Sequence, residues 1–359
     1  MKAKFYLIAA AACAALAACS KNEVAPVDVD QEITYQTIET KAASGFKDDN
    51  KFSSYAYFIP KGQLWDSYTG SPSSYISGAT ISYDKVNYKW KASNTYYWPK
   101  QGSLTFFAWS MNDDNAPAIN GDATVSSPAN KGITVTGYDI TQNRNRDFLV
   151  AEIAKDMKSD SVMGNHEDEN SHTWANGVPT VFKHALSKLV FKVQTVKGGS
   201  AFDYGTSTVF DVKEIKLSGV ETKANYAQEY QAGTNPSKHT WSDWTAENNA
   251  FPVFTGSKTA SESETQLAIG GSDYSLVIPQ NFTTGNLLTI KYTITTNYAG
   301  GGSPVVENVE QTKDLTEIYT SNWESGKIYT LVIKLGLDEI YWDPDVTDWV
   351  PGATSSITF

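Results

Sequence analysis

The sequence predicts an all-β protein built from β-sandwiches. Its apolar residues fall in short segments, and Gly, Pro, Asn, Asp or Ser separate these segments every ~8–15 residues. No long segment repeats apolar residues at the helical period of 3.6. Thr, Ser, Val and Tyr are abundant, with 20 Tyr in 359 residues, and this composition favours strands over helices.

The N-terminal half begins with a strand at residues 32–38, where apolar and polar residues alternate. A loop with an exposed Lys41 follows. Residues 112–132 are rich in turn-forming residues and predict a long loop, and a polar stretch precedes Val178. Further strands are predicted at residues 51–59, 79–90, 104–109, 147–151 and 181–196, the last as one long strand or a pair.

The strand pattern restarts after Gly198-Gly199-Ser200. This predicts an N-terminal sandwich at residues 32–197 and a C-terminal sandwich at 198–359, a number of domains that suits the length of the chain. Strands are expected at 210–220, 274–278, 288–294 and 329–335, whereas 221–271 is low in hydrophobicity. The end of the chain carries Ile357 and Phe359 at a period of two, within a short possible strand at 353–359.

The first 18 residues predict a signal peptide. Lys2 and Lys4 precede an apolar stretch of about 14 residues, which is too short to span a bilayer as a helix. Small residues then lead to Cys19, in a pattern that resembles the bacterial lipobox. We expect cleavage between Ala18 and Cys19, acylation of Cys19 with chains such as palmitate, and a polar tether at 19–31. The alternative is an ordinary signal peptide in which Cys19 is incidental.

The charge of the chain excludes some classes of partner. The sequence has 40 Asp and Glu against 29 Lys and Arg, a net charge of −11. Without Lys2 and Lys4 the balance is 40 acidic against 27 basic residues, or −13. Such a chain is a poor nucleic-acid ligand and does not bind anionic lipid by itself, so the predicted membrane anchor is the acyl group. We expect an exported lipoprotein at the outer membrane or cell surface.

Motifs for catalysis or cofactor binding are not found in the sequence. It has no G-x-S-x-G, P-loop or G-x-G-x-x-G, and no Cys remains after processing and lipidation. A pair of distant carboxylates for glycoside hydrolysis leaves no local signature. His166 and His172 lie in an acidic stretch that is better explained as a solvated loop than as a zinc site. Asp343, Asp345 and Asp348 do not match the spacing of a calcium loop. We therefore expect a non-enzymatic protein without metal or cofactor.

Trp241 and Trp244 are the candidate ligand-binding aromatics. They lie in a polar stretch, where two indole rings could stack on a sugar. The alternative is that Trp side chains fill a sandwich core or cover a strand edge.

Several segments, taken together and in order, resemble the fimbrillin family of Bacteroidetes, the subunits of type V pili. Cys19-Ser20-Lys21 resembles the start of the family, and Thr40-Lys41-Ala42 lies where its precursors carry a basic residue. The other matching segments are Tyr97-Trp98-Pro99, residues 104–109, 147–151 and 182–189, Ile278-Pro279-Gln280, residues 323–330 and 346–349.

The resemblance implies two transthyretin-like β-sandwiches in series and a structural or adhesive role in a fimbria, with other fimbrial subunits as partners. It also implies cleavage of the lipidated precursor between Lys41 and Ala42, which removes the strand at 32–38. A strand from a neighbouring subunit then fills the groove, and residues 353–359 are the candidate donor. The second hypothesis is a surface-anchored lipoprotein of the same fold that binds a carbohydrate, a host ligand or a bacterial surface ligand.

Overall fold

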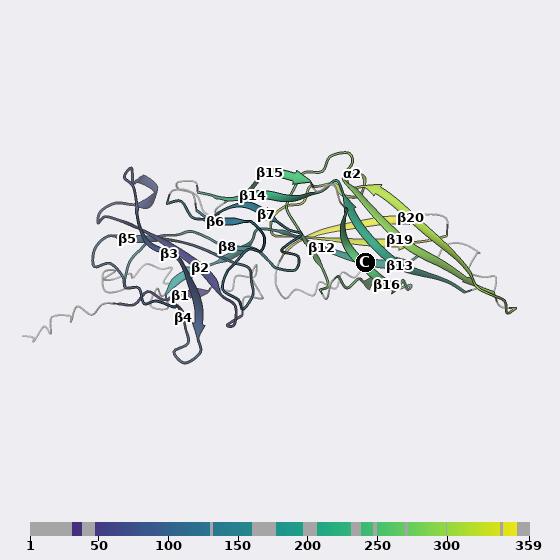
Figure 1. Cartoon of the computed structure of the whole chain (residues 1–359), viewed down its shortest axis with the longest axis horizontal. Helices are drawn as coiled ribbons and strands as arrows, with labels where there is room; N and C mark the ends of the chain where they lie inside the picture. The colour runs from purple at the N-terminus through teal and green to yellow at the C-terminus, as the bar shows by residue number, and fades with distance from the viewer. Residues whose placement is uncertain are drawn as a thin grey trace, which may run out of the picture.

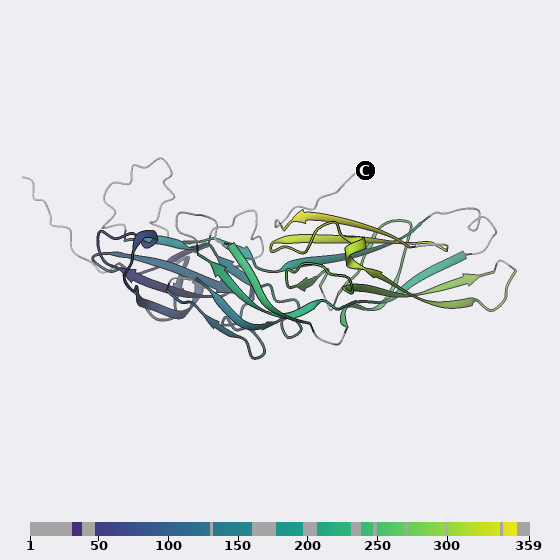
Figure 2. The same ribbon diagram turned by 90° about the horizontal axis from the view of Figure 1, so that it is seen from above.

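The computed structural model describes residues 31–37, 47–129, 132–159, 177–196, 207–230, 238–246, 250–269, 272–298, 300–337 and 340–349. Its strands form four sheets in an elongated molecule (Figures 1 and 2). In the described ranges, helical structure is limited to η1 (Trp65–Ser67) and α2 (Leu315–Ile318). The all-β sandwich prediction is confirmed.

The largest sheet contains nine strands from the first half of the chain. They are β1 (Tyr35–Thr37), β2 (Phe52–Ile59), β3 (Ser73–Asp84), β4 (Lys89–Ala92), β5 (Ser103–Ser110), β8 (Leu149–Ala151), β9 (Ala154–Met157), β10 (Val178–Thr180) and β11 (Phe182–His184). Their order is β10-β1-β4-β3-β2-β5-β8-β11, and β9 pairs with β5. The sheet curls on itself. This is shown by Tyr35 of β1, whose ring contacts Phe52 of β2 and Phe106 of β5, although neither strand is next to β1 in the sheet. These rings belong to one of the two apolar cores.

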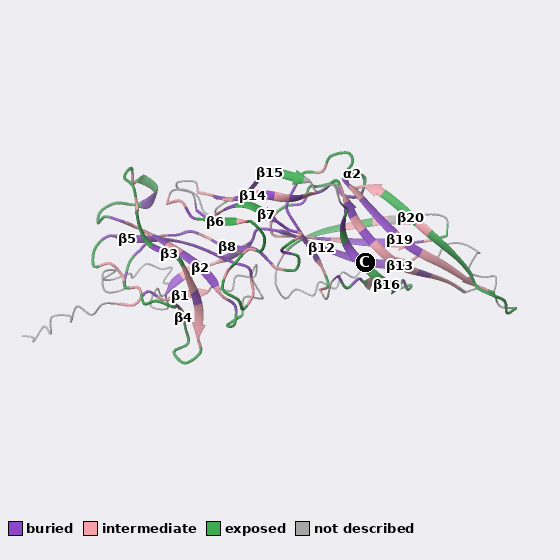
Figure 3. Ribbon diagram, in the orientation of Figure 1, coloured by how far each residue is buried: buried purple, intermediate pink, exposed green. Residues whose placement is uncertain are grey.

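The other face of β5 packs on a four-stranded sheet. Its strands are β6 (Thr124–Ser126), β7 (Thr134–Asp139), β14 (Glu221–Glu229) and β15 (Lys238–Ala246), in the order β15-β14-β7-β6. Phe148 lies between the two sheets, with its ring centroid 5.6 Å from Tyr138, 5.0 Å from Tyr226 and 6.3 Å from Trp109. β5 is buried on both faces, as Figure 3 shows along its length.

Two more sheets form the other end of the molecule. One contains β12 (Ser187–Thr195), β17 (Thr265–Gln266), β18 (Ser275–Val277), β21 (Lys327–Leu335) and β22 (Ile340–Asp348), in the order β17-β12-β21-β22 with β18 also on β12. The other contains β13 (Ser207–Ser218), β16 (Phe251–Thr259), β19 (Leu287–Asn297) and β20 (Val305–Asp314), in the order β16-β13-β19-β20. Alternate residues of these strands, such as Phe191, Phe210, Ile290 and Leu331, are buried in the larger core.

Strand pairing crosses the boundary predicted at residues 197 and 198 in both directions. β12 precedes the boundary and pairs in parallel with β21 from Lys188↔Ile328 to Thr195↔Leu335. β14 and β15 follow the boundary, and β14 pairs with β7. The larger core accordingly runs from Ile59 to Leu335. The division into two domains at this position stays a prediction.

Most of the predicted strands are present, but several strands were not predicted. The predicted loop at 112–132 contains β6, and no strand was expected at β7, β9, β20 or β22. The alternating segments 288–294 and 329–335 are β19 and β21, and 181–196 is the strand pair β11 and β12. Residues 221–271, described from the sequence only as low in hydrophobicity, contain β14, β15, β16 and β17. Long stretches of this region are edge strand, so exposed polar side chains dominate its composition.

Candidate functional site

The first strand lies inside the nine-stranded sheet instead of at its edge. β1 pairs in parallel with β10, with Tyr35 opposite Val178, and antiparallel with β4, with Tyr35 opposite Trp90. The preceding residues extend this pairing, because Ile33 N–H donates to the Tyr96 carbonyl at 2.8 Å and Val178 N–H donates to the Thr34 carbonyl at 2.8 Å. The short strand thus supplies backbone partners to both of its neighbours.

Two side chains of this segment enter the core at a spacing of two. Ile33 is 2% exposed and Tyr35 is 3% exposed. The Tyr35 ring meets Phe52 and Phe106 edge to face, with centroid distances of 5.5 and 5.9 Å. Its hydroxyl lies 3.1 Å from Ser54 Oγ, to which it donates a hydrogen bond, and burial raises the Tyr35 pKa. The segment therefore closes an aromatic groove in the sheet.

A glycine allows β10 to approach this segment closely. Gly177 has φ +109°, and a Cβ atom at this position would lie 2.6 Å from the Thr34 carbonyl oxygen. No other residue type fits such a contact without a shift of backbone. Sequence reasoning missed both Gly177 and the pairing of residues 31–33 with Tyr96 to Trp98, since the tyrosine-tryptophan motif gives no sign of its partner strand.

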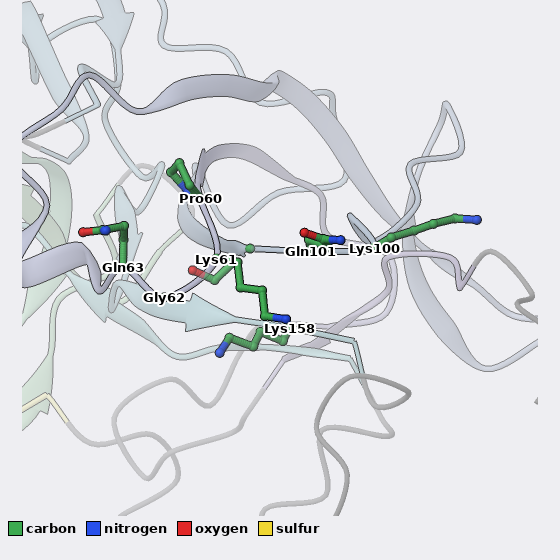
Figure 4. Close-up of a pocket in the computed structure, with 9 residues that line it drawn as sticks. Pro60, Lys61, Gly62, Gln63, Lys100, Gln101 and Lys158 are labelled. Carbon is green, nitrogen blue, oxygen red and sulfur yellow. The ribbon is translucent and has the colours of Figure 1, made fainter.

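A second candidate site is a pocket of about 270 Å³ at the ends of β2 and β5 (Figure 4). Its lining residues come from three short segments, after β2, before β5 and after β9, and include Lys61, Lys100 and Lys158, together with Gln63 and Gln101. Among the residues that the structure describes, no Asp or Glu lines it. The labelled lysine side chains point in different directions (Figure 4). Sequence reasoning missed this site, although Pro60-Lys61-Gly62 and Lys100-Gln101-Gly102 are similar turns that a search for paired basic turns would find.

The structure does not place Trp241 and Trp244 as one exposed surface. Trp241 is 5% exposed, and its indole N–H donates to the Ala185 carbonyl at 3.0 Å. Its ring meets Tyr138 and Tyr226 edge to face in the core. Trp244, further along the same edge strand, is 43% exposed. The prediction that both rings stack on one ligand is corrected, because Trp241 is a core residue.

Comparison with known proteins identifies the family. The family model described as fimbrillin-like matches residues 40–349. The chain belongs to the fimbrillin-like family. No curated protein matches it. The chain is similar to the crystal structure of a fimbrial protein from Bacteroides vulgatus ATCC 8482, with 17% identity and a TM-score of 0.65 over 89% of this chain and 100% of that one. It is also aligned with the tip fimbrial protein Mfa3 from Porphyromonas gingivalis, with 12% identity and a TM-score of 0.37 over 89% and 99%.

The predicted processing sites of this fimbrillin-like chain lie outside the described residues. These are Ala18 and Cys19 at the signal cleavage site, Lys41 and Ala42 at the maturation site, and residues 353–359 at the C-terminus. Of the strand predicted at 32–38, the structure describes residues up to Thr37, including an isolated bridge between Glu32 and Tyr97. Within the described ranges, no helix has the length and apolar character needed to cross a bilayer.

Two of the three aspartates considered near the end of the fimbrillin-like chain are paired with lysines. Asp343 lies 2.8 Å from Lys334 Nζ, and Asp348 forms an ion pair with Lys327. In the part of the chain that the structure describes, no three His, Cys, Asp or Glu side chains are grouped so that they could hold a metal ion. His166 and His172 lie outside that part.

Proposed function

We propose that this chain is a non-enzymatic structural and adhesive subunit of a cell-surface fimbria, a type V pilus. It is exported as a lipoprotein acylated at Cys19, cleaved between Lys41 and Ala42 at the cell surface, and assembled with other subunits by donor-strand exchange. Membership of the fimbrillin-like family supports the fimbrial role. The observation that carries the assembly mechanism is the insertion of residues 31–37 between β4 and β10.

Loss of this segment has a direct physical consequence. β4 and β10 lose hydrogen-bond partners, and the rings of Phe52 and Phe106 lose the side chain that covers them. A groove with unpaired backbone groups and an apolar floor favours the addition of a strand from another chain. Burial of one aromatic side chain is worth roughly 1.5–3 kcal/mol, so the incoming strand must present matching apolar residues.

The C-terminal segment has the required pattern. Ile33 and Tyr35, the two buried side chains of the closing segment, are two residues apart. Ile357 and Phe359 have the same spacing. Because side chains of a strand alternate between its two faces, Ile357 and Phe359 would face the same groove.

Limited trypsin digestion of residues 19–359 with Cys19→Ser tests this mechanism. We expect N-terminal sequencing to find a new end at Ala42, and electrophoresis to show a ladder of oligomers that resist SDS. A Lys41→Gln variant should stay uncut at this position and monomeric. A variant lacking residues 353–359 should be cut but should form no ladder. A chain that is cut after Lys41 and remains monomeric contradicts donor-strand assembly.

A further inference from the structure

The last described residue of the chain stacks on a residue that is distant in the sequence. Trp349 directly follows β22, and His184 is the last residue of β11. Their rings lie 3.7 Å apart between centroids and are inclined by only 6°. β11 belongs to the nine-stranded sheet and β22 to the sheet of β12 and β21, so the contact joins two sheets that share no hydrogen-bonded strands.

A buried carboxylate fixes the orientation of the His184 ring. His184 Nδ1 lies 2.7 Å from Asp147 Oδ2, and these side chains are only 5% and 7% exposed. Asp147 precedes Phe148, whose ring lies in the centre of the core. The hydrogen bond holds the imidazole in one orientation, so that its flat face is presented to Trp349.

Trp349 is held by two further contacts. Its backbone N–H donates to the Gly326 carbonyl at 2.9 Å. The ammonium group of Lys188 lies 5.3 Å from the centre of a Trp349 ring and 4.0 Å from the centre of the Tyr274 ring. Burial lowers the pKa of Lys188, while the charges of Asp147 and Asp273 act in the opposite direction. A cation in this position is attracted by the face of an indole.

β22 buries little of its surface. Among the described strands it pairs only with β21, at the edge of the sheet, and no residue of Ile340–Asp348 whose exposure is described is buried. Edge strands with little buried surface open locally more easily than central ones. The stack at Trp349 lies at the end of this strand, where fraying would begin.

We propose that Asp147, His184, Lys188 and Trp349 form a clasp that holds the end of β22 against the start of β12. The clasp is a positioning device: His184 acts on the last strand by presenting a ring to Trp349. Residues 350–359, the candidate donor region of the proposed function on which this consequence rests, follow Trp349 directly in the sequence. Opening of the clasp therefore controls how readily the C-terminal segment becomes available to a neighbouring subunit.

Hydrogen exchange measured by mass spectrometry on the uncut monomer tests the clasp without any assembly. We expect the peptide covering β22 to exchange about five- to tenfold faster in a Trp349→Ala variant, the loss expected for one stacked aromatic pair. Peptides of β13 and β19 should not change. Trp349→Phe should restore slow exchange, because it keeps a flat ring. Val346→Ala, on an exposed position of the same strand, is the matched control.

A remote variant sharpens the test. His184→Ala, 165 positions away in the sequence, should accelerate exchange in β22 as Trp349→Ala does, and the double variant should add nothing further. If His184→Ala does not fold, the comparison of Trp349→Ala with Trp349→Phe decides. Unchanged exchange in β22, or a uniform increase in all peptides, overturns the clasp. The ladder assay after trypsin is a separate readout: absence of a ladder in the wild type refutes the proposed function and leaves the clasp standing.

Discussion

The Tyr226 hydroxyl lies 2.6 Å from Nδ1 of His239, and the pair occupies neighbouring edge and inner strands of one sheet. Burial lowers the pKa of His239 to about 4, and the positive charge of Lys183 adds to this effect. The imidazole is therefore neutral in the folded protein at neutral pH and shares a hydrogen bond with the tyrosine hydroxyl.

This pair predicts a stability that depends on pH. Between pH 6.5, the ordinary pKa of histidine, and pH 4, the unfolded chain binds a proton at His239 that the folded chain does not. The contribution of His239 to stability is thus present above pH 6.5 and is lost as the pH falls toward 4, by about 1–3 kcal/mol. Urea denaturation at pH 7.5 and 5.0 measures this loss. A His239→Gln variant should lose less stability over the same interval, and an identical loss in the variant would contradict the assignment.

Single residues also show which features can be predicted from the sequence and which cannot. The alternation of residues 32–38 correctly predicts that Ile33 and Tyr35 point inward, because a period of two is a local property. The partners of these residues, Tyr96 and Val178, are set by tertiary packing and have no local signal. Gln280 was noted from the sequence only as part of a motif. Its side chain accepts a hydrogen bond from Glu221 N–H at 2.8 Å and donates to the Glu221 and Ile278 carbonyls, so it supplies hydrogen-bond partners to these backbone groups.

β14 shows why one region of strands was overlooked. Its residues alternate between buried and half-buried positions, as a strand between two others should. The buried positions, however, are occupied by Thr222, Ala224, Tyr226 and Gln228. Only one of these has a large apolar side chain, so the alternation of burial is not an alternation of hydrophobicity. A pattern read from apolar residues therefore finds β19, with Leu288, Ile290 and Tyr292, and passes over β14.

The turn between β13 and β14 depends on a contact between two glycines. Gly219 has φ +72°, and a Cβ atom there would lie 2.3 Å from the Gly285 carbonyl oxygen. The Asn286 side-chain amide donates to the Gly219 carbonyl, at 2.6 Å, and fixes the two loops together. The direction in which β14 leaves the C-terminal sheets thus depends on a position that only glycine occupies without strain.

A Gly219→Ala variant should accordingly lose stability by more than the roughly 1 kcal/mol that a left-handed backbone alone costs an alanine. Gly137→Ala is the matched control, since Gly137 has φ +73° and no atom lies within 4 Å of its added Cβ. Thermal denaturation of the two variants and the wild type measures the difference. Equal losses in both variants would show that the backbone conformation, and not the contact with Gly285, decides the cost.

For the whole molecule, crossing strands link the two ends. The restart of the strand pattern after residue 198 indicates that sandwich units are repeated along the chain. It does not indicate that β14 returns to pair with β7, with β15 beside it in the same sheet. Such long-range pairing depends on complementary surfaces, here Tyr138, Phe148 and Trp241, and leaves no periodic trace in the sequence. The fold class was therefore predictable, whereas the route of the chain between the sheets was not.

This linkage predicts cooperative unfolding. Because the larger core is continuous from Ile59 to Leu335, we expect residues 19–359 with Cys19→Ser to unfold in one calorimetric transition whose calorimetric and van't Hoff enthalpies agree. Trp241→Ala should lower the temperature of that transition as a whole, by several degrees. Two transitions, of which only one shifts in the variant, would instead indicate two independent domains.

The crossing of β12 also determines how the molecule carries tension. Only Ala185 and Leu186, both fully buried, separate β11 from β12. A force that pulls the two ends of the molecule apart therefore passes from the nine-stranded sheet into β12 and its parallel partner β21. Such a force loads the hydrogen bonds of this ladder together, in shear, because β12 lies along the long axis (Figures 1 and 2). A ladder pulled in this direction resists as a unit, whereas one pulled from its end opens bond by bond.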